Sequence, residues 1–140
     1  MHTPTKAHWQ VVIDKLKSIL PMAKHESNFD MGQGRVNCFH KCGTVHCVGG
    51  WYAIASGLHN MGPVDYEDGA DFMAADLGFK QLHPSVEAKE LLRDWAYENC
   101  HIWGNHSGYS MFSDEAAYGY AKDMQGVITY LEGVKDRSPE

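Results

Sequence analysis

Apolar side chains recur at helical spacing near the start of the chain. From Trp9 to Leu20 they return every three or four residues, which places them on one face of a helix. Thr3 and Pro4 are suited to begin this helix, since a proline in the first helical position gives up no intrahelical hydrogen bond. Pro21 predicts its end, because the residue before a proline is driven away from helical geometry. The apolar face comprises Trp9, Val12, Ile13, Leu16, Ile19 and Leu20, and the polar face, which we expect to be solvated, comprises Lys6, Asp14, Lys15 and Lys17.

The middle of the chain predicts a long loop followed by two helices. Glycines and asparagines punctuate residues 24–43, where the only regular element that we expect is a short strand over 35–39. Thr44 is suited to cap the next helix, because its hydroxyl can accept hydrogen bonds from the free N–H groups of the first turn. A short helix follows over 68–77, and Gly78 is suited to close it. The apolar side of the helix after Thr44 comprises Val48, Trp51, Tyr52, Ala55 and Leu58.

The last third of the chain predicts two helices separated by an aromatic loop. The first begins near Ser85, and Ser113 is suited to cap the second. Their apolar faces comprise Ala88, Leu91, Leu92, Trp95 and Ala96 in the first, and Ala117, Tyr120, Ala121, Met124, Val127, Ile128, Leu131 and Val134 in the second. The tail over 135–140 is expected to fray. Because strand signals are weak throughout, we expect a mainly α protein, in which residues 1–140 form a single compact domain of four or five helices, with the long loop before the Cys-rich helix.

The composition narrows the class of protein. Hydrophobic residues make up 44% of the chain and charged residues 21%, which is typical of a globular domain and not of a disordered one. The 12 basic and 18 acidic side chains give a net charge of −6, which argues against non-specific binding of nucleic acid. No apolar run approaches the ~20 residues that cross a membrane, and no secretory signal is visible. We therefore expect no membrane partner and a cytoplasmic location.

Three of the four cysteines lie within ten residues, interleaved with histidines. Thiolates and imidazoles are the ligands that zinc prefers, so Cys38, His40, Cys42 and Cys47 could hold a structural zinc ion. Their spacing is not that of a zinc knuckle or ribbon, and a disulfide from Cys47 to Cys42 or Cys38 is disfavoured in a reducing compartment. The simplest interpretation is that these thiols are free and pack as small hydrophobic groups. We therefore expect no cofactor, with zinc as the alternative.

Cys47 is also a candidate nucleophile. It would lie in the first turn of the predicted helix, where the N–H groups and the helix dipole stabilise a thiolate. A histidine such as His106 or His101 could then act as the base of a cysteine amidase or peptidase. The segment 46–51 resembles the start of the catalytic helix in papain-like and cell-wall amidase domains, whose histidine comes from a β-sheet after that helix. Because residues beyond 58 predict helices and loops, the sequence favours a protein that is not an enzyme.

The segment 42–51 also resembles a C-G-T-x-x-C-x-x-G-W motif of small bacteriophage, prophage and bacterial proteins. The motif positions in this chain are Cys42, Thr44, Cys47, Gly50 and Trp51. Weaker matches to the same group occur over 29–31 and 74–79, whereas His46 stands where the group carries a small residue. The resemblance implies a phage-related or bacterial origin, and hence a bacterial cytoplasm, but no activity. Packing explains most of the motif, since the threonine would cap the helix, Gly50 would admit a crossing helix and Trp51 would anchor the core.

The segment 97–112 combines aromatic rings with hydrogen-bonding side chains. Such a mixture in a glycine-containing loop is typical of a ligand pocket or a protein-binding surface, although the same rings could pin the loop onto the core. We single out Trp103, His106 and Tyr109 as the binding residues. The leading hypothesis is therefore a small accessory protein that binds a host protein or a small ligand through this loop.

Overall fold

A computed structural model of the chain describes residues 2–23, 39–40, 43–44, 48–57, 66–81, 84–99 and 124–140. These residues form α1 (Lys6–Ala23), β1 (Phe39–His40), β2 (Gly43–Thr44), α2 (Val48–Ala55), α3 (Tyr66–Asp76), α4 (Ala88–Asn99) and α6 (Met124–Asp136). The strands form an antiparallel pair, in which Phe39 lies opposite Thr44 and His40 opposite Gly43. The prediction of a mainly α protein is confirmed. Of the strand predicted over 35–39, only Phe39 is described, and it lies in β1; residues 35–38 lie outside the described residues.

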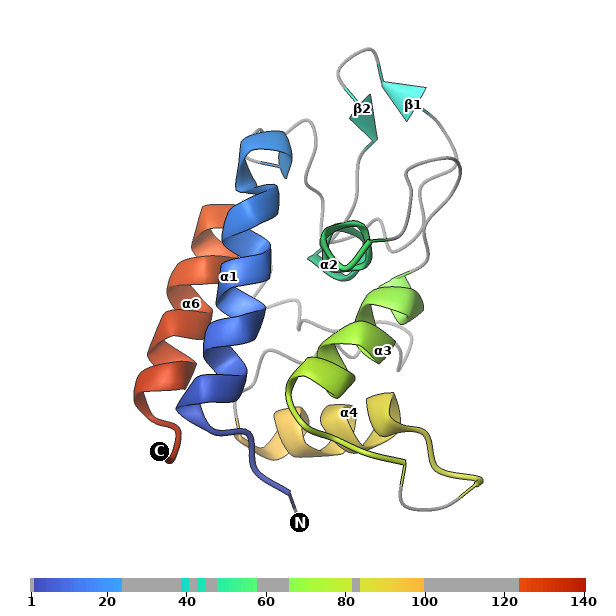
Figure 1. The fold of residues 1–140 in the computed structure, drawn as a ribbon, viewed down its shortest axis with the longest axis vertical. Helices are drawn as coiled ribbons and strands as arrows, with labels where there is room; N and C mark the ends of the chain where they lie inside the picture. The colour runs from blue at the N-terminus through green and yellow to red at the C-terminus, as the bar shows by residue number, and fades with distance from the viewer. Residues whose placement is uncertain are drawn as a thin grey trace.

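The helices from the two ends of the chain, α1 and α6, lie side by side and run antiparallel (Figure 1). Lys135 in the last turn of α6 donates a hydrogen bond to the side-chain oxygen of Gln10, near the start of α1. On the other side of α1, α2 packs between α1 and α3, and α4 packs against α3 at the end of the molecule remote from the strands (Figure 1). The core therefore lies in the space that α1 shares with the other helices.

The core contains the apolar faces that the sequence predicts. Every described member of the faces expected in the first helix, in the helix after Ser85 and in the last helix is buried or partly buried. The largest fully buried side chains are Trp9, Ile13, Leu16, Trp51, Tyr52, Met73, Leu77, Leu92, Met124, Ile128 and Leu131. Since burying one such side chain stabilises the fold by about 1.5–3 kcal/mol, these faces provide most of the driving force for folding.

The start of α1 differs from the prediction, because Thr5 and not Thr3 caps the helix. The Thr5 hydroxyl oxygen accepts a hydrogen bond from the N–H of His8 at 3.3 Å, and the N–H of Thr5 donates to Nδ1 of His8 at 3.0 Å. This reciprocal pair has the geometry of a capping box, with histidine in the place that glutamate or glutamine usually takes. Pro4 therefore precedes the helix, where it is buried.

The predicted end of α1 at Pro21 is wrong, because the helix continues to Ala23 with Pro21 inside it. A proline in the last turn removes one N–H group, whose partner would have been the carbonyl of Lys17. Lys17 is exposed, so water can solvate that carbonyl and the cost of continuing the helix is small.

The prediction that Thr44 caps the following helix is also wrong. Thr44 belongs to β2 and pairs with Phe39, and α2 begins only at Val48. A β-branched residue suits a strand, and the pairing across the hairpin takes precedence over the capping preference of threonine. The first turn of α2 therefore begins later than the sequence indicates.

The chain's tail is held in place, contrary to the predicted fraying of 135–140. α6 continues to Asp136, and the carbonyl of Pro139 accepts a hydrogen bond from the N–H of Lys6 at 2.8 Å. The Lys6 ammonium lies 3.0 Å from the carboxylate of Glu140. The tail thus satisfies one of the free N–H groups at the start of α1, a long-range contact that local composition does not indicate.

Gly78 closes α3, as the sequence predicts. Its φ of +85° is one that glycine adopts most readily. The N–H of Phe79 donates to the carbonyl of Ala74 and the N–H of Gly78 to that of Ala75, both at 3.0 Å. These two bonds form a Schellman motif, which satisfies carbonyls that the end of the helix leaves free.

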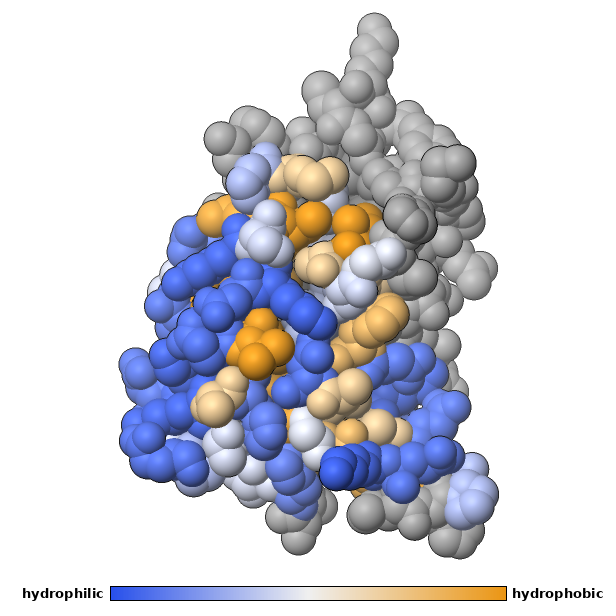
Figure 2. Space-filling model, in the orientation of Figure 1, coloured by the Kyte–Doolittle hydropathy of each residue, from blue (hydrophilic) through white to orange (hydrophobic). Residues whose placement is uncertain are grey.

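The face of the molecule shown in Figure 2 is largely hydrophilic over α1 and α6, with small separate apolar areas. Val11 and Met22 are the large hydrophobic side chains that the described residues expose. Among the helices that the structure describes, none has the length and apolar character needed to cross a membrane.

Candidate functional site

Most of the side chains that the sequence singles out for a site lie outside the described residues. They are Cys38, Cys42, Cys47, Trp103, His106 and Tyr109. The backbone of His40 lies in β1 and that of Gly50 in α2. The side chain of Trp51 is 1% exposed, which confirms that this motif position anchors the core. Within the described part of the chain, no group of three His, Cys, Asp or Glu side chains is placed to hold a metal ion.

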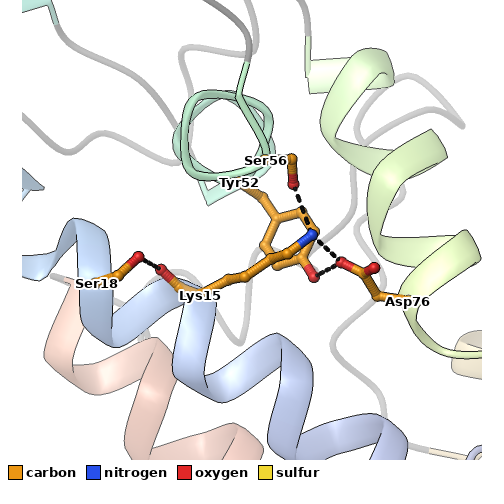
Figure 3. Close-up of polar contacts among 5 residues, drawn as sticks. All are labelled: Lys15, Ser18, Tyr52, Ser56 and Asp76. Carbon is orange, nitrogen blue, oxygen red and sulfur yellow. Dashed lines mark hydrogen bonds and ion pairs between the residues drawn. The ribbon is translucent and has the colours of Figure 1, made fainter.

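Four polar side chains meet where α1, α2 and α3 converge (Figure 3). We call them the three-helix cluster: Lys15, Tyr52, Ser56 and Asp76. Nζ of Lys15 lies 2.6 Å from Oδ2 of Asp76 and donates to Oγ of Ser56 at 3.3 Å. The Tyr52 hydroxyl donates to the same Oδ2, and Nζ of Lys15 lies 5.4 Å from the centre of the Tyr52 ring. One carboxylate oxygen of α3 therefore accepts from side chains of both other helices.

The three helices position this cluster in different ways. Tyr52 is buried beside Trp51 on α2, and Ser56 immediately follows that helix. Asp76 is the last residue of α3, where the helix dipole disfavours a negative charge, and the nearby ammonium of Lys15 offsets this effect. The side chains of Lys15 and Asp76 are 31% and 21% exposed, so water screens their attraction only in part.

Lys15 is solvated only in part, although the sequence places it on the polar face, since its side chain is 31% exposed. Its side chain carries the ammonium group to Asp76 on α3. A sequence signal for this existed, since Lys15 follows Val12 by three residues and precedes Ile19 by four, which places it at the border of the apolar face. The sequence does not indicate which residue pairs with Lys15, because Asp76 is 61 residues away along the chain.

The chemistry of the three-helix cluster follows from the state of Tyr52. Burial raises the pKa of the Tyr52 phenol far above its usual value, and donation to the negatively charged Asp76 acts in the same direction. The phenol therefore keeps its proton and serves as a donor, which makes it unsuited to proton transfer near neutral pH. The arrangement favours a structural role, in which the cluster fixes α1, α2 and α3 relative to one another.

Replacing Tyr52 with phenylalanine should lower the free energy of unfolding by about 1 kcal/mol at neutral pH, through loss of the bond to Asp76. The folded protein holds the phenolic proton, whereas the unfolded chain releases it as the pH passes about 10. The stabilisation by Tyr52 is therefore complete below that pH and falls progressively above it. At pH 11 the fall is about 1.4 kcal/mol, which is enough to remove the gap of about 1 kcal/mol between wild type and Tyr52→Phe. Urea denaturation at several pH values measures this gap, and a gap that stays constant would contradict the assignment.

Searches for similar proteins found no matching family model, curated protein or solved structure. The three-helix cluster accounts for how the helices are held, and the candidate chemistry that the cluster does not use belongs to the cysteine-rich segment and to the segment 97–112.

Proposed function

We propose that this chain is a small accessory protein of the bacteriophage or prophage type, which binds a host protein or a small ligand through the segment 97–112. The observation that carries this proposal is how the two helices on either side of that segment are held. Trp95 of α4 and Met124 of α6 are 5% and 0% exposed, and both belong to the same hydrophobic core. The segment 97–112 therefore lies, along the sequence, between two helices that the core holds, and connections between such fixed elements commonly carry binding residues.

The residue types of this segment support the same function. Tryptophan and tyrosine contribute a large share of the binding energy in many interfaces, because they bury much apolar area and still offer a hydrogen-bond donor. Trp103 and Tyr109 supply these groups, and His106 adds a ring that can donate or accept. A host protein or a ligand with both apolar and hydrogen-bonding groups would match this combination.

The origin that we propose is supported by the motif over 42–51. Trp51 occupies a core position and Gly50 lies in a helix that packs against both α1 and α3. Both observations suit a motif that is selected for folding. The resemblance to bacteriophage and prophage proteins would then reflect a shared way of packing this helix. A bacterial cytoplasm is the corresponding location.

Binding through the segment 97–112 is tested with Trp103→Ala, His106→Ala and Tyr109→Ala. The wild-type protein is immobilised, captured host proteins are quantified by mass spectrometry, and the affinity of each reproducible candidate is then measured by titration. Loss of a central tryptophan or tyrosine should weaken binding by about 10-fold or more. Val11→Ala and Met22→Ala are matched controls, since each removes an exposed apolar side chain of α1.

The controls decide how the result is interpreted. Binding that weakens equally in the Val11 and Met22 variants would contradict a site in the segment 97–112. Elemental analysis of the same preparations separates the alternatives, because zinc in a 1:1 ratio would favour the metal-stabilised module of Cys38, His40, Cys42 and Cys47. Rapid alkylation of Cys47 well below pH 8.5 would favour the thiol enzyme.

A further inference from the structure

Three segments far apart in the chain meet at the start of α1, at a place that we call the α1 junction: residues 2–8, 77–79 and 139–140. Nε2 of His2 lies 2.8 Å from the carbonyl oxygen of Leu77, beyond the end of α3. The carbonyl of Pro139 accepts from the N–H of Lys6. The arm before α1, the end of α3 and the tail after α6 are thus joined through one helix end.

His8 lies at the centre of the α1 junction. Its Nδ1 accepts the hydrogen bond from the N–H of Thr5, and this requires a lone pair on Nδ1. The proton of the neutral ring is therefore on Nε2, which lies 2.9 Å from the point where a side chain of Gly78 would begin. The rings of His2 and His8 meet in a T-shaped arrangement, with their centres 5.5 Å apart. His8 thus contacts the arm and the end of α3 at once.

We propose that His8 is a pH-sensitive cap of α1, which holds the α1 junction closed when it is neutral and loosens it when it is protonated. A capping box normally uses glutamate or glutamine, which remain acceptors at pH values where histidine takes up a proton. A proton from solvent that binds Nδ1 removes the acceptor of the Thr5 N–H. It also places a positive charge at the N-terminal end of a helix, where the dipole disfavours it.

The other charged or titratable groups of the α1 junction act in known directions. Protonated His2 would repel protonated His8, and it could keep its bond to Leu77, because Nε2 already donates to that carbonyl. The Lys6 ammonium is paired with Glu140, so it contributes little net charge toward His8. Beyond the end of α3, Gly78, which has no side chain, lies against His8, and the ring of Phe79 lies against His2. Acid therefore weakens the cap through His8.

The N–H of Thr5 is the specific reporter of this change. In the protonated ring, Nδ1–H could turn to the Thr5 hydroxyl, which lies 3.1 Å away, so the ring need not leave its place. The N–H of Thr5 would still lose its acceptor, because an imidazolium ring has no lone pair to offer. Loosening should thus appear first as faster hydrogen exchange at Thr5, followed by the Lys6 amide that binds the tail.

The test compares amide hydrogen exchange of the full chain at about pH 7.5 and pH 5, corrected for the intrinsic rate. In the wild type, protection of the Thr5 amide should fall about tenfold at the lower pH. His8→Gln keeps an acceptor in the same place without titrating, so its protection should not change. His2→Gln is the matched control, and it should keep the pH dependence of the wild type. A fall that persists in His8→Gln, or no fall in the wild type, would overturn the proposal.

A measurement on the unaltered protein guards against a variant that does not fold. The nitrogen chemical shifts of the His8 ring distinguish its two neutral forms, and the geometry requires the form with the proton on Nε2. Observation of the Nδ1–H form at neutral pH would refute the proposal without any substitution.

Discussion

Replacing Trp51 with alanine is expected to lower the free energy of unfolding by about 3–5 kcal/mol. The side chain is almost fully buried on α2, a helix of 8 residues that packs against both α1 and α3. A helix this short, with glycine at positions 49 and 50, has little stability of its own and depends on its tertiary contacts. The loss of this ring should therefore weaken the attachment of α2 as a whole. Urea denaturation followed by circular dichroism measures the change.

Trp51→Phe serves as the matched control, since phenylalanine refills much of the volume that alanine leaves empty. The free energy of unfolding should then fall by clearly less than in the alanine variant. If the free energy of unfolding of Trp51→Ala were within about 1 kcal/mol of the wild-type value, Trp51 could not be the anchor of the motif.

Replacing Gly78 with alanine should cost about 2–3 kcal/mol for two separate reasons. The φ of +85° is unfavourable for a residue with a side chain. The new carbon would also lie 2.9 Å from Nε2 of both His2 and His8. His2 is exposed and can move aside by giving up its bond to Leu77, but His8 is held by Thr5. Thermal and urea denaturation measure the cost.

Gly57→Ala separates the backbone cost from the steric one. Gly57 also has a positive φ, of +109°, but a side-chain carbon there would meet no atom within 4 Å. Gly57→Ala should therefore lower the free energy of unfolding only by the cost of placing alanine at a positive φ. Adding His8→Ala to the Gly78 variant should recover part of the lost stability, because it removes the atoms that clash. If Gly78→Ala cost the same stability in the wild type and in the His8→Ala variant, the contact with His8 would not be responsible.

The sequence predicts the helices of this fold well where one face is continuously apolar. In α6, Val127, Ile128 and Leu131 are buried as their helical spacing predicts. The glycine after α3 predicts the end of that helix, because a helix readily ends on a residue with a positive φ. Such elements are decided by neighbours three or four residues away. For this reason the hydrophobic pattern of a single sequence is sufficient to predict these helices.

Two of the errors have a different cause, which is contact between distant parts of the chain. The tail does not fray because Pro139 bonds to Lys6, and Lys15 is not fully solvated because it reaches Asp76. Thr44 pairs in a hairpin, a choice that local propensity cannot distinguish from a helix cap. The candidate binding residues of the segment 97–112 remain a prediction, since Trp103, His106 and Tyr109 lie outside the described residues.

The pairing of α1 with α6 has a consequence for synthesis on the ribosome. The apolar face of α1 is synthesised well before α6, one of the helices that covers it. Closing so long a loop is entropically costly, so this contact should form late. Until α6 has been synthesised, part of the apolar face of α1 would need a temporary cover, which is the situation in which nascent chains engage chaperones.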